Sequence, residues 1–343
     1  MQRSLEISEV FKNCSNTFLR SLSLDKQRVY SAITACRSSK LGAHIRYCSS
    51  CNYKEQAYNS CRNRHCPKCQ GSISANWTKQ RNKELLPVEY FHSVFTIPKE
   101  LRSICYQNKK VFYEIMFRSV SETLNQVAAN PKFLGAKIGF ITILHSWNQK
   151  LEYHPHIHVI SPKGGLSNNE WISSQHNFFL PVRALSKVYR GKLIDYLRKA
   201  YKDNELNFFG SSSIFKQRTE KDIVSFSYRD SRNQYKKKTL TLNANTFTKR
   251  FLLHVIPKNF TRIRHYGLLA SANKAKALEK IRNLLNTKIK RQEIKPLNRK
   301  CPKCLESELK TLVLDMIPHR KMPLIPKSQQ YYETRPPPIA CRT

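Results

Sequence analysis

Acidic residues are scarce in this chain, which carries 23 Asp and Glu against 61 Lys and Arg and has a formal net charge of +38. An imbalance of this size favours a polyanionic partner, and nucleic acid is the most abundant one. A membrane surface is the alternative partner. However, the sequence lacks any run of 18 or more apolar residues and any strongly apolar basic helix, which argues against a membrane protein.

The N-terminal stretch, residues 1–24, lacks the apolar core of a secretory signal. The eleven cysteines are odd in number, and most of them lie in the paired or near-paired spacings of metal sites rather than of disulfides. We therefore expect a reducing compartment, the cytoplasm.

Two Cys-x2-Cys pairs, Cys48 with Cys51 and Cys66 with Cys69, predict one closed structural Zn²⁺ site. Each pair can aim two thiolates at one ion from a tight turn, and two pairs complete a tetrahedron. Cys61 and His65, between the pairs, are alternate ligands. The basic residues of this region that we consider as nucleic-acid contacts are Arg62, Arg64 and Lys68, with solvated surface charge as the alternative. Cys301 and Cys304 form half of a zinc knuckle without an evident second half.

A strand rich in histidine is predicted at residues 154–160. Side chains alternate between the two faces of a strand, so His154, His156 and His158 share one face. Imidazoles in this arrangement suit zinc, copper, iron, nickel or manganese, and a histidine-rich solvent face is the alternative. The preceding strand ends at His145, which is a further ligand or a structural histidine.

The remaining pattern mixes strands with amphipathic helices. Residues 88–97 are rich in β-branched and aromatic side chains, whereas residues 99–126 repeat apolar side chains at helical spacing. Further expected elements are helices at residues 182–202 and 271–288, a hairpin of residues 222–228 and 236–242, and a helix that begins after Asn243 or Asn245 and runs to 255.

These elements predict an α+β fold in three parts. Residues 1–85 form N-terminal helices and a zinc-binding module, and residues 86–290 form an antiparallel sheet flanked by helices. Residues 291–343 form a basic, proline-containing tail that we expect to be disordered.

Four sequence blocks point to a known family. They are residues 60–69 (SCRNRHCPKC), 95–101 (FTIPKEL), 154–166 (HPHIHVISPKGGL), and 250–257 (RFLLHVIP) with 262–268 (RIRHYGL). Together they resemble the zinc-finger-bearing HUH transposases of rolling-circle insertion sequences, also called two-tyrosine transposases. The resemblance extends over residues 20–305, and the first and third blocks are highly specific in combination.

The resemblance implies an HUH-endonuclease topology and DNA strand nicking. His156 and His158, completed by His154 or a residue outside the strand, would hold Mg²⁺ or Mn²⁺ and polarise a scissile phosphate. A tyrosine would attack that phosphate and leave a covalent 5′-phosphotyrosine and a free 3′-hydroxyl. The implied partner is single-stranded DNA at the element ends, in the bacterial cytoplasm and nucleoid. Candidate phosphate contacts of the fourth block are Arg262 and Arg264.

The sequence departs from the family at the nucleophile. No tyrosines after the histidine strand have the Tyr-x3-Tyr spacing, and the interval from Gly191 to Tyr228 is shorter than the family pattern implies. We expect an internal shortening near residues 205–222 that removes the nucleophile segment. Tyr196 and Tyr201 are the local substitutes, with partly buried helix aromatics as the alternative for both.

Two functions of different classes follow. One is a transposase that nicks and rejoins single strands, and the other is a non-catalytic, zinc-dependent DNA-binding remnant of a transposase. An unrelated metallohydrolase is poorly supported, because no paired carboxylate site accompanies the histidines.

Overall fold

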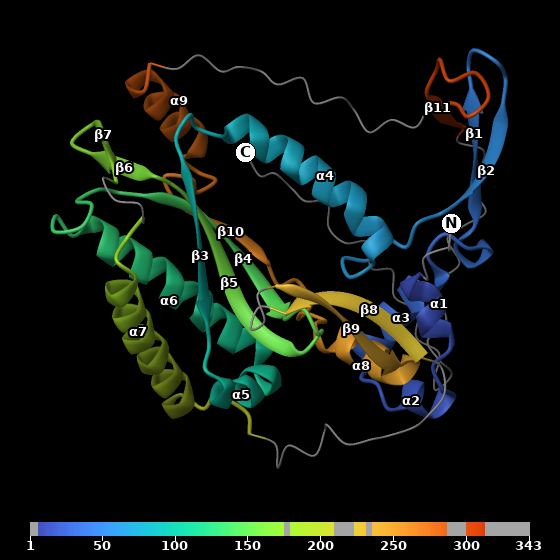
Figure 1. Ribbon diagram of the computed structural model, residues 1–343, viewed down its shortest axis with the longest axis horizontal. Helices are drawn as coiled ribbons and strands as arrows, with labels where there is room; N and C mark the ends of the chain where they lie inside the picture. The colour runs from blue at the N-terminus through green and yellow to red at the C-terminus, as the bar shows by residue number, and fades with distance from the viewer. Residues whose placement is uncertain (1–5, 175–178, 209–222, 231–234, 287–299, 313–343) are drawn as a thin grey trace. The chain divides into compact units, whose positions relative to one another are not determined.

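The computed structural model describes residues 6–174, 179–208, 223–230, 235–286 and 300–312 (Figure 1). The chain forms two compact units, each assembled from separate stretches. Of the described residues, the first unit comprises 6–83, 223–230, 235–255 and 300–312, and the second comprises 84–174, 179–208 and 256–286. The α+β prediction is confirmed. The predicted boundaries at 85 and 290 differ from this division, because the hairpin after residue 222 and the described part of the tail join the first unit.

The first unit has a helical part built around Phe11. The Phe11 ring is fully buried, stacks on Tyr30 with 5.3 Å between ring centroids, and meets Phe251 edge-on at 5.4 Å. Asn243 caps the helix that contains Phe251, because its side chain accepts a hydrogen bond from the Thr246 N–H at 2.7 Å. The elements of this part are α1 (Ile7–Lys12), α2 (Asn16–Arg20), α3 (Leu24–Ala35), η1 (Ser39–Leu41), α4 (Pro67–Glu84), β8 (Ile223–Asp230), β9 (Lys236–Asn243) and α8 (Ala244–Leu253).

The first unit also contains a small antiparallel sheet. It joins β1 (Ala43–Cys48) to β2 (Lys54–Tyr58) on one side and to β11 (Leu309–Leu312) on the other. The prediction of a disordered tail is therefore wrong for residues 300–312, which contain β11. Local composition does not reveal this strand, because its pairing partner β1 lies far away in the sequence. Residues 313–343 of the predicted tail lie outside the described residues.

The second unit is a four-stranded antiparallel sheet in the order β10-β4-β5-β3. Its strands are β3 (Tyr90–Thr96), β4 (Gly139–Trp147), β5 (Tyr153–Pro162) and β10 (Ile263–Gly267), and β6 (Gly164–Ser167) pairs with β7 (Glu170–Ser173). The helices of this unit are η2 (Lys99–Leu101), α5 (Arg102–Gln107), α6 (Lys109–Ala129), α7 (Val182–Lys202) and α9 (Lys274–Leu284). The helix expected at 99–126 is interrupted at Asn108, whose side chain instead exchanges hydrogen bonds with the backbone of Asn207 at 2.7 and 2.9 Å.

One face of this sheet is covered by α6 and α7. Tyr153 and Ile157 of β5 are buried there, and the Tyr153 hydroxyl lies 2.9 Å from the hydroxyl of Tyr113 on α6. α7 packs on α6 and sets Tyr189 against Phe95 of β3, with 5.1 Å between ring centroids. This face holds the main core of the unit.

The opposite face carries the histidines of β5. Leu278 and Ile281 of α9 pack with Ile141 of β4 at one end of this face. His145 and His156, which are direct register partners, lie toward the other end. Within this unit, α9 therefore packs at the Ile141 end of the face, and the histidines lie half-buried toward the other end. No helix among the described residues is long and apolar enough to cross a membrane.

Candidate metal centres and nucleic-acid interface

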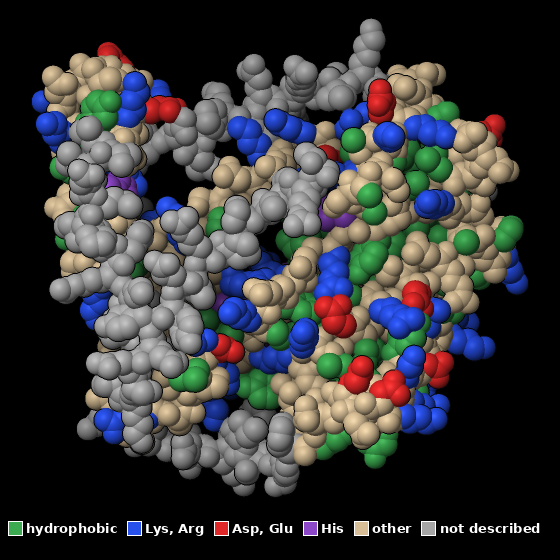
Figure 2. Space-filling view, turned by 180° about the vertical axis from the view of Figure 1, so that it is seen from behind, with side chains coloured by type: hydrophobic (Ala, Val, Ile, Leu, Met, Phe, Trp, Pro, Cys, Tyr) green, Lys and Arg blue, Asp and Glu red, His purple; other side chains and the backbone are tan. Residues whose placement is uncertain are grey.

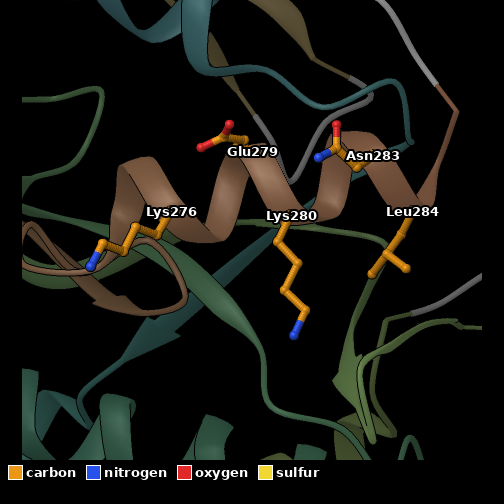
Figure 3. A pocket seen from close by; sticks show the side chains of 5 residues that line it. All are labelled: Lys276, Glu279, Lys280, Asn283 and Leu284. Carbon is orange, nitrogen blue, oxygen red and sulfur yellow. The ribbon is translucent and has the colours of Figure 1, made fainter.

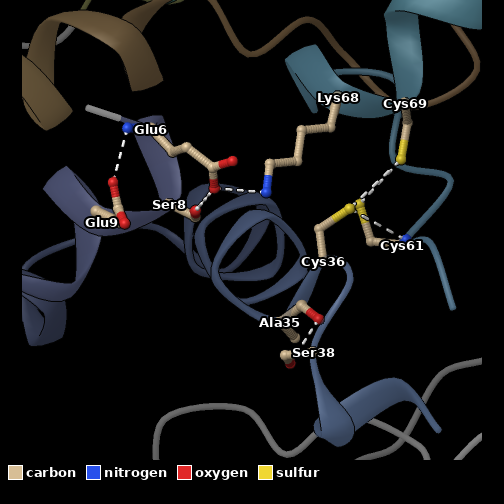
Figure 4. A network of polar contacts seen from close by, with 9 residues as sticks. All are labelled: Glu6, Ser8, Glu9, Ala35, Cys36, Ser38, Cys61, Lys68 and Cys69. Atoms are coloured by element: carbon tan, nitrogen blue, oxygen red, sulfur yellow. Dashed lines mark hydrogen bonds and ion pairs between the residues drawn. The ribbon is translucent and has the colours of Figure 1, made fainter. Parts of the chain in front are cut away.

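Four cysteines form a first cluster at the junction of α3 and α4. Cys36 directly follows α3, and Cys66 and Cys69 lie at the start of α4. The Cys69 sulfur lies 3.6 Å from that of Cys36 and 3.7 Å from that of Cys61. Figure 4 shows these three sulfurs converging, and all four ligand atoms of the cluster lie within 4.8 Å of one another. A tetrahedral thiolate set of this kind closes around one structural Zn²⁺.

A second cluster joins Cys48 and Cys51 to Cys301 and Cys304. The sulfurs of Cys48 and Cys304 lie 3.6 Å apart, and so do those of Cys51 and Cys301.

These two clusters correct the prediction of a single site made from Cys48, Cys51, Cys66 and Cys69. The first pair lies at the tip of the β1–β2 hairpin and the second at the start of a helix, so each pair completes its tetrahedron with other cysteines. Cys61, one of the two alternate ligands, belongs to the first cluster, whereas His65 belongs to neither cluster. The sequence reasoning missed Cys36, which has no paired spacing to signal it.

The third cluster consists of His145 on β4 and His156 and His158 on β5. One ring nitrogen from each lies within 4.8 Å of the other two. The Nδ1 of His156 lies 2.6 Å from the backbone oxygen of His154 and donates to it, which leaves Nε2 as the ligand atom. The Nδ1 of His158 lies 2.7 Å from the Nε2 of His92 on β3. The structure thus groups His145, and not His154, with the other two histidines.

The environment keeps these imidazoles neutral. Burial, and then the neighbouring His158, lower the pKa of His145 to about 4. Burial, and then His156 and His92, likewise lower the pKa of His158 to about 4, and burial also lowers the pKa of His156. A neutral imidazole is the form that binds a metal ion.

The donor set of the histidine cluster indicates which ion fits. Among the described residues, no carboxylate belongs to this group. Imidazole binds borderline cations better than it binds Mg²⁺, and affinity for nitrogen ligands rises from Mn²⁺ toward the later metals. The residues therefore fit Mn²⁺ better than Mg²⁺.

The predicted nucleic-acid contacts fall into different environments. Arg264 makes two hydrogen bonds of 2.7 Å to the Glu114 carboxylate of α6 and lies over the Phe117 ring, so its guanidinium is committed to packing within the unit. Lys68 forms an ion pair of 2.5 Å with Glu6 (Figure 4). Arg62 is exposed in the loop before α4.

Arg262 lies close to the histidine cluster. Its charge is among the influences that lower the pKa of His145. Figure 2 shows Lys and Arg side chains outnumbering Asp and Glu over the described surface in that view. Among the basic candidates, Arg262 is the one whose charge reaches the histidine cluster.

Neither candidate tyrosine shares the face of the histidines. Tyr196 lies on α7, and its hydroxyl donates to Glu122 of α6 while Arg118 stacks over its ring at 4.2 Å. α7 and α6 cover the other face of the sheet. Tyr201 is exposed farther along α7, where its ring meets Phe208. Tyr196 is therefore a partly buried helix aromatic, as the alternative had it, whereas Tyr201 is exposed.

The Glu122 network makes a stability prediction. Burial alone would raise the pKa of Glu122, but hydrogen bonds from Tyr196, Arg118 and Lys192 outweigh burial and lower that pKa to about 2. Because this pKa is depressed, the ionised Glu122 carboxylate stabilises the folded state. This stabilisation is complete above the ordinary carboxyl pKa and is lost as the pH falls toward 2. At pH 7, Glu122→Gln is expected to lower the opening free energy of α7 by about 1 kcal/mol, discounted for partial exposure.

Hydrogen exchange of the α7 amides measures this effect. Glu100→Gln, at an exposed carboxylate of η2, is the control and should leave exchange unchanged. Equal protection of α7 in the Glu122→Gln chain and the native chain would show that the network does not stabilise the helix.

Two hollows of the described surface lie away from the histidine cluster. One follows α9 and is lined by Lys276, Glu279, Lys280, Asn283 and Leu284 (Figure 3). Glu279 and Asn283 point to one side of the helix and Lys280 to the other, where its Nζ lies 2.5 Å from the Asn169 side-chain oxygen. Because a single helix lines this hollow, its polar groups do not converge on a ligand.

Comparisons with known proteins agree with these features. A family model described as a transposase zinc-binding domain matches residues 7–97, and one described as a putative transposase matches residues 139–222 and 209–277. The putative transposase y4qJ of Sinorhizobium fredii is 35% identical over 338 residues, covering 83% of this chain and 85% of the relative. The transposase for insertion sequence element IS801 of Pseudomonas savastanoi pv. phaseolicola is 25% identical over 290 residues, covering 69% of this chain and 68% of the relative.

The fold, the cysteine clusters and these matches define the class of the protein as an insertion-sequence transposase with a zinc-binding domain. Within that class, the chain belongs to the HUH rolling-circle, two-tyrosine transposase family.

A solved structure of the conjugative relaxase TrwC with oriT DNA, in a metal-bound form, is also similar to this chain. The identity is 12% and the TM-score 0.27, over 56% of this chain and 71% of that one. At that level the similarity carries no argument about function.

Proposed function

We propose that this transposase nicks and rejoins single strands of DNA at the ends of an insertion sequence, at a site centred on His145, His156 and His158. The observation that carries the proposal is the convergence of three neutral imidazoles on the sheet face, away from the end at which α9 packs. His92, Val94 and Thr96 of β3 continue this face and are exposed, which gives an extended strand room to approach.

The residues of the site have separate roles in this proposal. A divalent cation, Mn²⁺ in preference to Mg²⁺, supplies Lewis-acid polarisation of a phosphate oxygen when bound. His145, His156 and His158 hold it, and the carbonyl of His154 and the ring of His92 fix the orientations of His156 and His158. Arg262 adds positive charge beside His145, where the phosphate backbone would approach.

A nucleophile is the further group that strand nicking requires. A tyrosine at the site would form a bond to phosphorus and release the 3′-oxygen of the neighbouring nucleotide. Tyr196 and Tyr201 lie on the helix that covers the other face, so neither is placed to attack.

Two findings support an internal loss of the nucleophile segment. The putative-transposase model matches in two pieces that meet at residues 209–222, where we expect the shortening. The alignment with the Sinorhizobium fredii relative spans 338 residues although it uses only 83% of this 343-residue chain, so several dozen positions carry residues that this chain lacks.

A second candidate function rests on this internal loss. In it, the chain binds element ends and a divalent ion without cutting the strand. Both candidates place the protein with DNA in the cytoplasm, a reducing compartment in which the thiols of the two cysteine clusters stay available to a metal ion.

A covalent-adduct assay separates the two candidates. The chain is incubated with single-stranded element-end DNA and Mn²⁺, and a protein–DNA adduct that resists denaturation is sought. The matched variant is Tyr196→Phe with Tyr201→Phe, which keeps both rings and removes both hydroxyls. We expect any adduct to survive in this variant, because neither hydroxyl faces the histidines.

Each outcome of the assay is decisive. An adduct in both chains supports nicking by a tyrosine outside α7. If no adduct forms and the chain still binds DNA in a Mn²⁺-dependent way, the result supports the second candidate. An adduct that disappears in the double variant contradicts our placement of the two tyrosines.

A further inference from the structure

The cluster of Cys48, Cys51, Cys301 and Cys304 lies partly outside the matched zinc-binding domain, which ends at residue 97. Its two halves are separated by 256 residues between Cys48 and Cys304 and by 250 between Cys51 and Cys301. The matched domain therefore contains only half of this ligand set.

The two halves have the same backbone geometry. In the first, the N–H of Asn52 donates to the carbonyl of Cys48 at 3.1 Å, and Asn52 has φ +55°. In the second, the N–H of Leu305 donates to the carbonyl of Cys301 at 3.0 Å, and Leu305 has φ +58°. A left-handed conformation is unfavourable for leucine, so a local constraint must hold this turn. Two matching turns that each aim two sulfurs at one point are the geometry of a pair of zinc knuckles.

The strands bring the two halves together. β11 pairs antiparallel with β1, with Cys48 opposite Leu309 and Tyr47 opposite Lys310. β2 pairs with the other edge of β1, so the two knuckles and three strands form one ribbon, which we define as residues 43–58 and 300–312. The Ser50 and Ser307 hydroxyls also meet between the knuckles.

The ribbon has almost no hydrophobic core. Of its described side chains, the buried ones are Cys48 and Cys301, each with 0% of its surface exposed. The outward positions of β2 are exposed, and so are Lys310 and Thr311 of β11. A sheet of this size without a core requires a metal or another cross-link to fold.

We propose that Cys48, Cys51, Cys301 and Cys304 bind a second structural Zn²⁺ and that the ribbon folds only with this ion. The thiols lose their protons as they bind, and the four sulfurs fill the tetrahedron, so no position remains open for catalysis. The ion fastens residues 300–312 to the N-terminal region. The zinc-binding module of this transposase is therefore assembled from both ends of the sequence.

Titration with Co²⁺ under reducing conditions tests the proposal on the full chain. Co²⁺ replaces Zn²⁺, and sulfur-to-cobalt charge-transfer absorption reports thiolate sites without interference from the histidine cluster. We expect two equivalents with this absorption in the native chain and one in the Cys301→Ser, Cys304→Ser variant. The matched control, Cys36→Ser with Cys61→Ser, should also retain one equivalent, at the ribbon.

A rescue variant distinguishes metal binding from packing. Histidine is a zinc ligand, so Cys304→His should take up two equivalents with weaker charge-transfer absorption and should restore amide protection in residues 43–58. One thiolate equivalent in the native chain, two in the Cys301→Ser, Cys304→Ser variant, or one in Cys304→His would each overturn the proposal.

Discussion

Cys66→Ser is expected to remove one Zn²⁺ per chain and to unfold the helical part of the first unit, while the ribbon keeps its own ion. Cys66 belongs to the cluster that ties the end of α3 to the start of α4, and Cys69, another ligand, is the buried residue of α4. Because α4 buries so little apolar surface, its attachment to α3 depends on the metal ion. A structural zinc site contributes about 10–16 kcal/mol of apparent binding free energy in small zinc peptides at neutral pH. Whole domains are stable by about 5–15 kcal/mol, so the loss of the site is comparable to the entire stability of this helical part.

Zinc content and thermal unfolding measure this effect together. The matched control is Cys14→Ser in the same unit. Its sulfur lies 3.2 Å from the Thr248 hydroxyl and belongs to neither cluster, so serine can keep the contact and the zinc content should not change. A Cys66→Ser chain with native zinc content and a native melting temperature would show that the first cluster is not a structural metal site.

The predictions that succeeded rested on local periodicity. The alternation along residues 154–160 fixed which face carries the histidines, and β5 has that alternation between buried and half-buried side chains. A cap at Asn243 or Asn245 followed from short-range backbone chemistry, and the structure has it at Asn243. Both features depend on neighbours within a few residues, so a single sequence contains the information.

The predictions that the structure corrected depend on contacts between residues far apart in the sequence. Spacing shows that Cys66 and Cys69 can share an ion, but it does not show which two further thiolates complete the tetrahedron. That choice depends on Cys36, which follows α3, and on residues 300–312, which reach β1 as a strand. The role of Arg264 was likewise hidden, because its partner Glu114 lies 150 residues earlier in the sequence.

His156→Ala is expected to weaken Mn²⁺ binding by more than about 100-fold. Loss of a residue that only hydrogen-bonds to a metal ligand lowers metal affinity by about 10–100-fold, and loss of a direct ligand lowers it further. The remaining nitrogens of His145 and His158 then leave the ion with two protein ligands in place of three. Mn²⁺-dependent affinity for single-stranded DNA should fall in parallel, whereas affinity without metal should persist through the basic surface.

His154→Ala provides the matched control for this change. His154 lies on the same strand and face as His156, yet its ring does not belong to the cluster. Its backbone carbonyl, which orients His156, remains in the alanine variant.

Calorimetric titration of Mn²⁺ into the zinc-loaded chain tests the histidine site most directly. The native chain and His154→Ala should each bind one Mn²⁺ with similar affinity, and His156→Ala should show no measurable site over the same range. Equal Mn²⁺ affinity in the His156→Ala chain and the native chain would contradict the assignment of the histidine cluster as the metal centre.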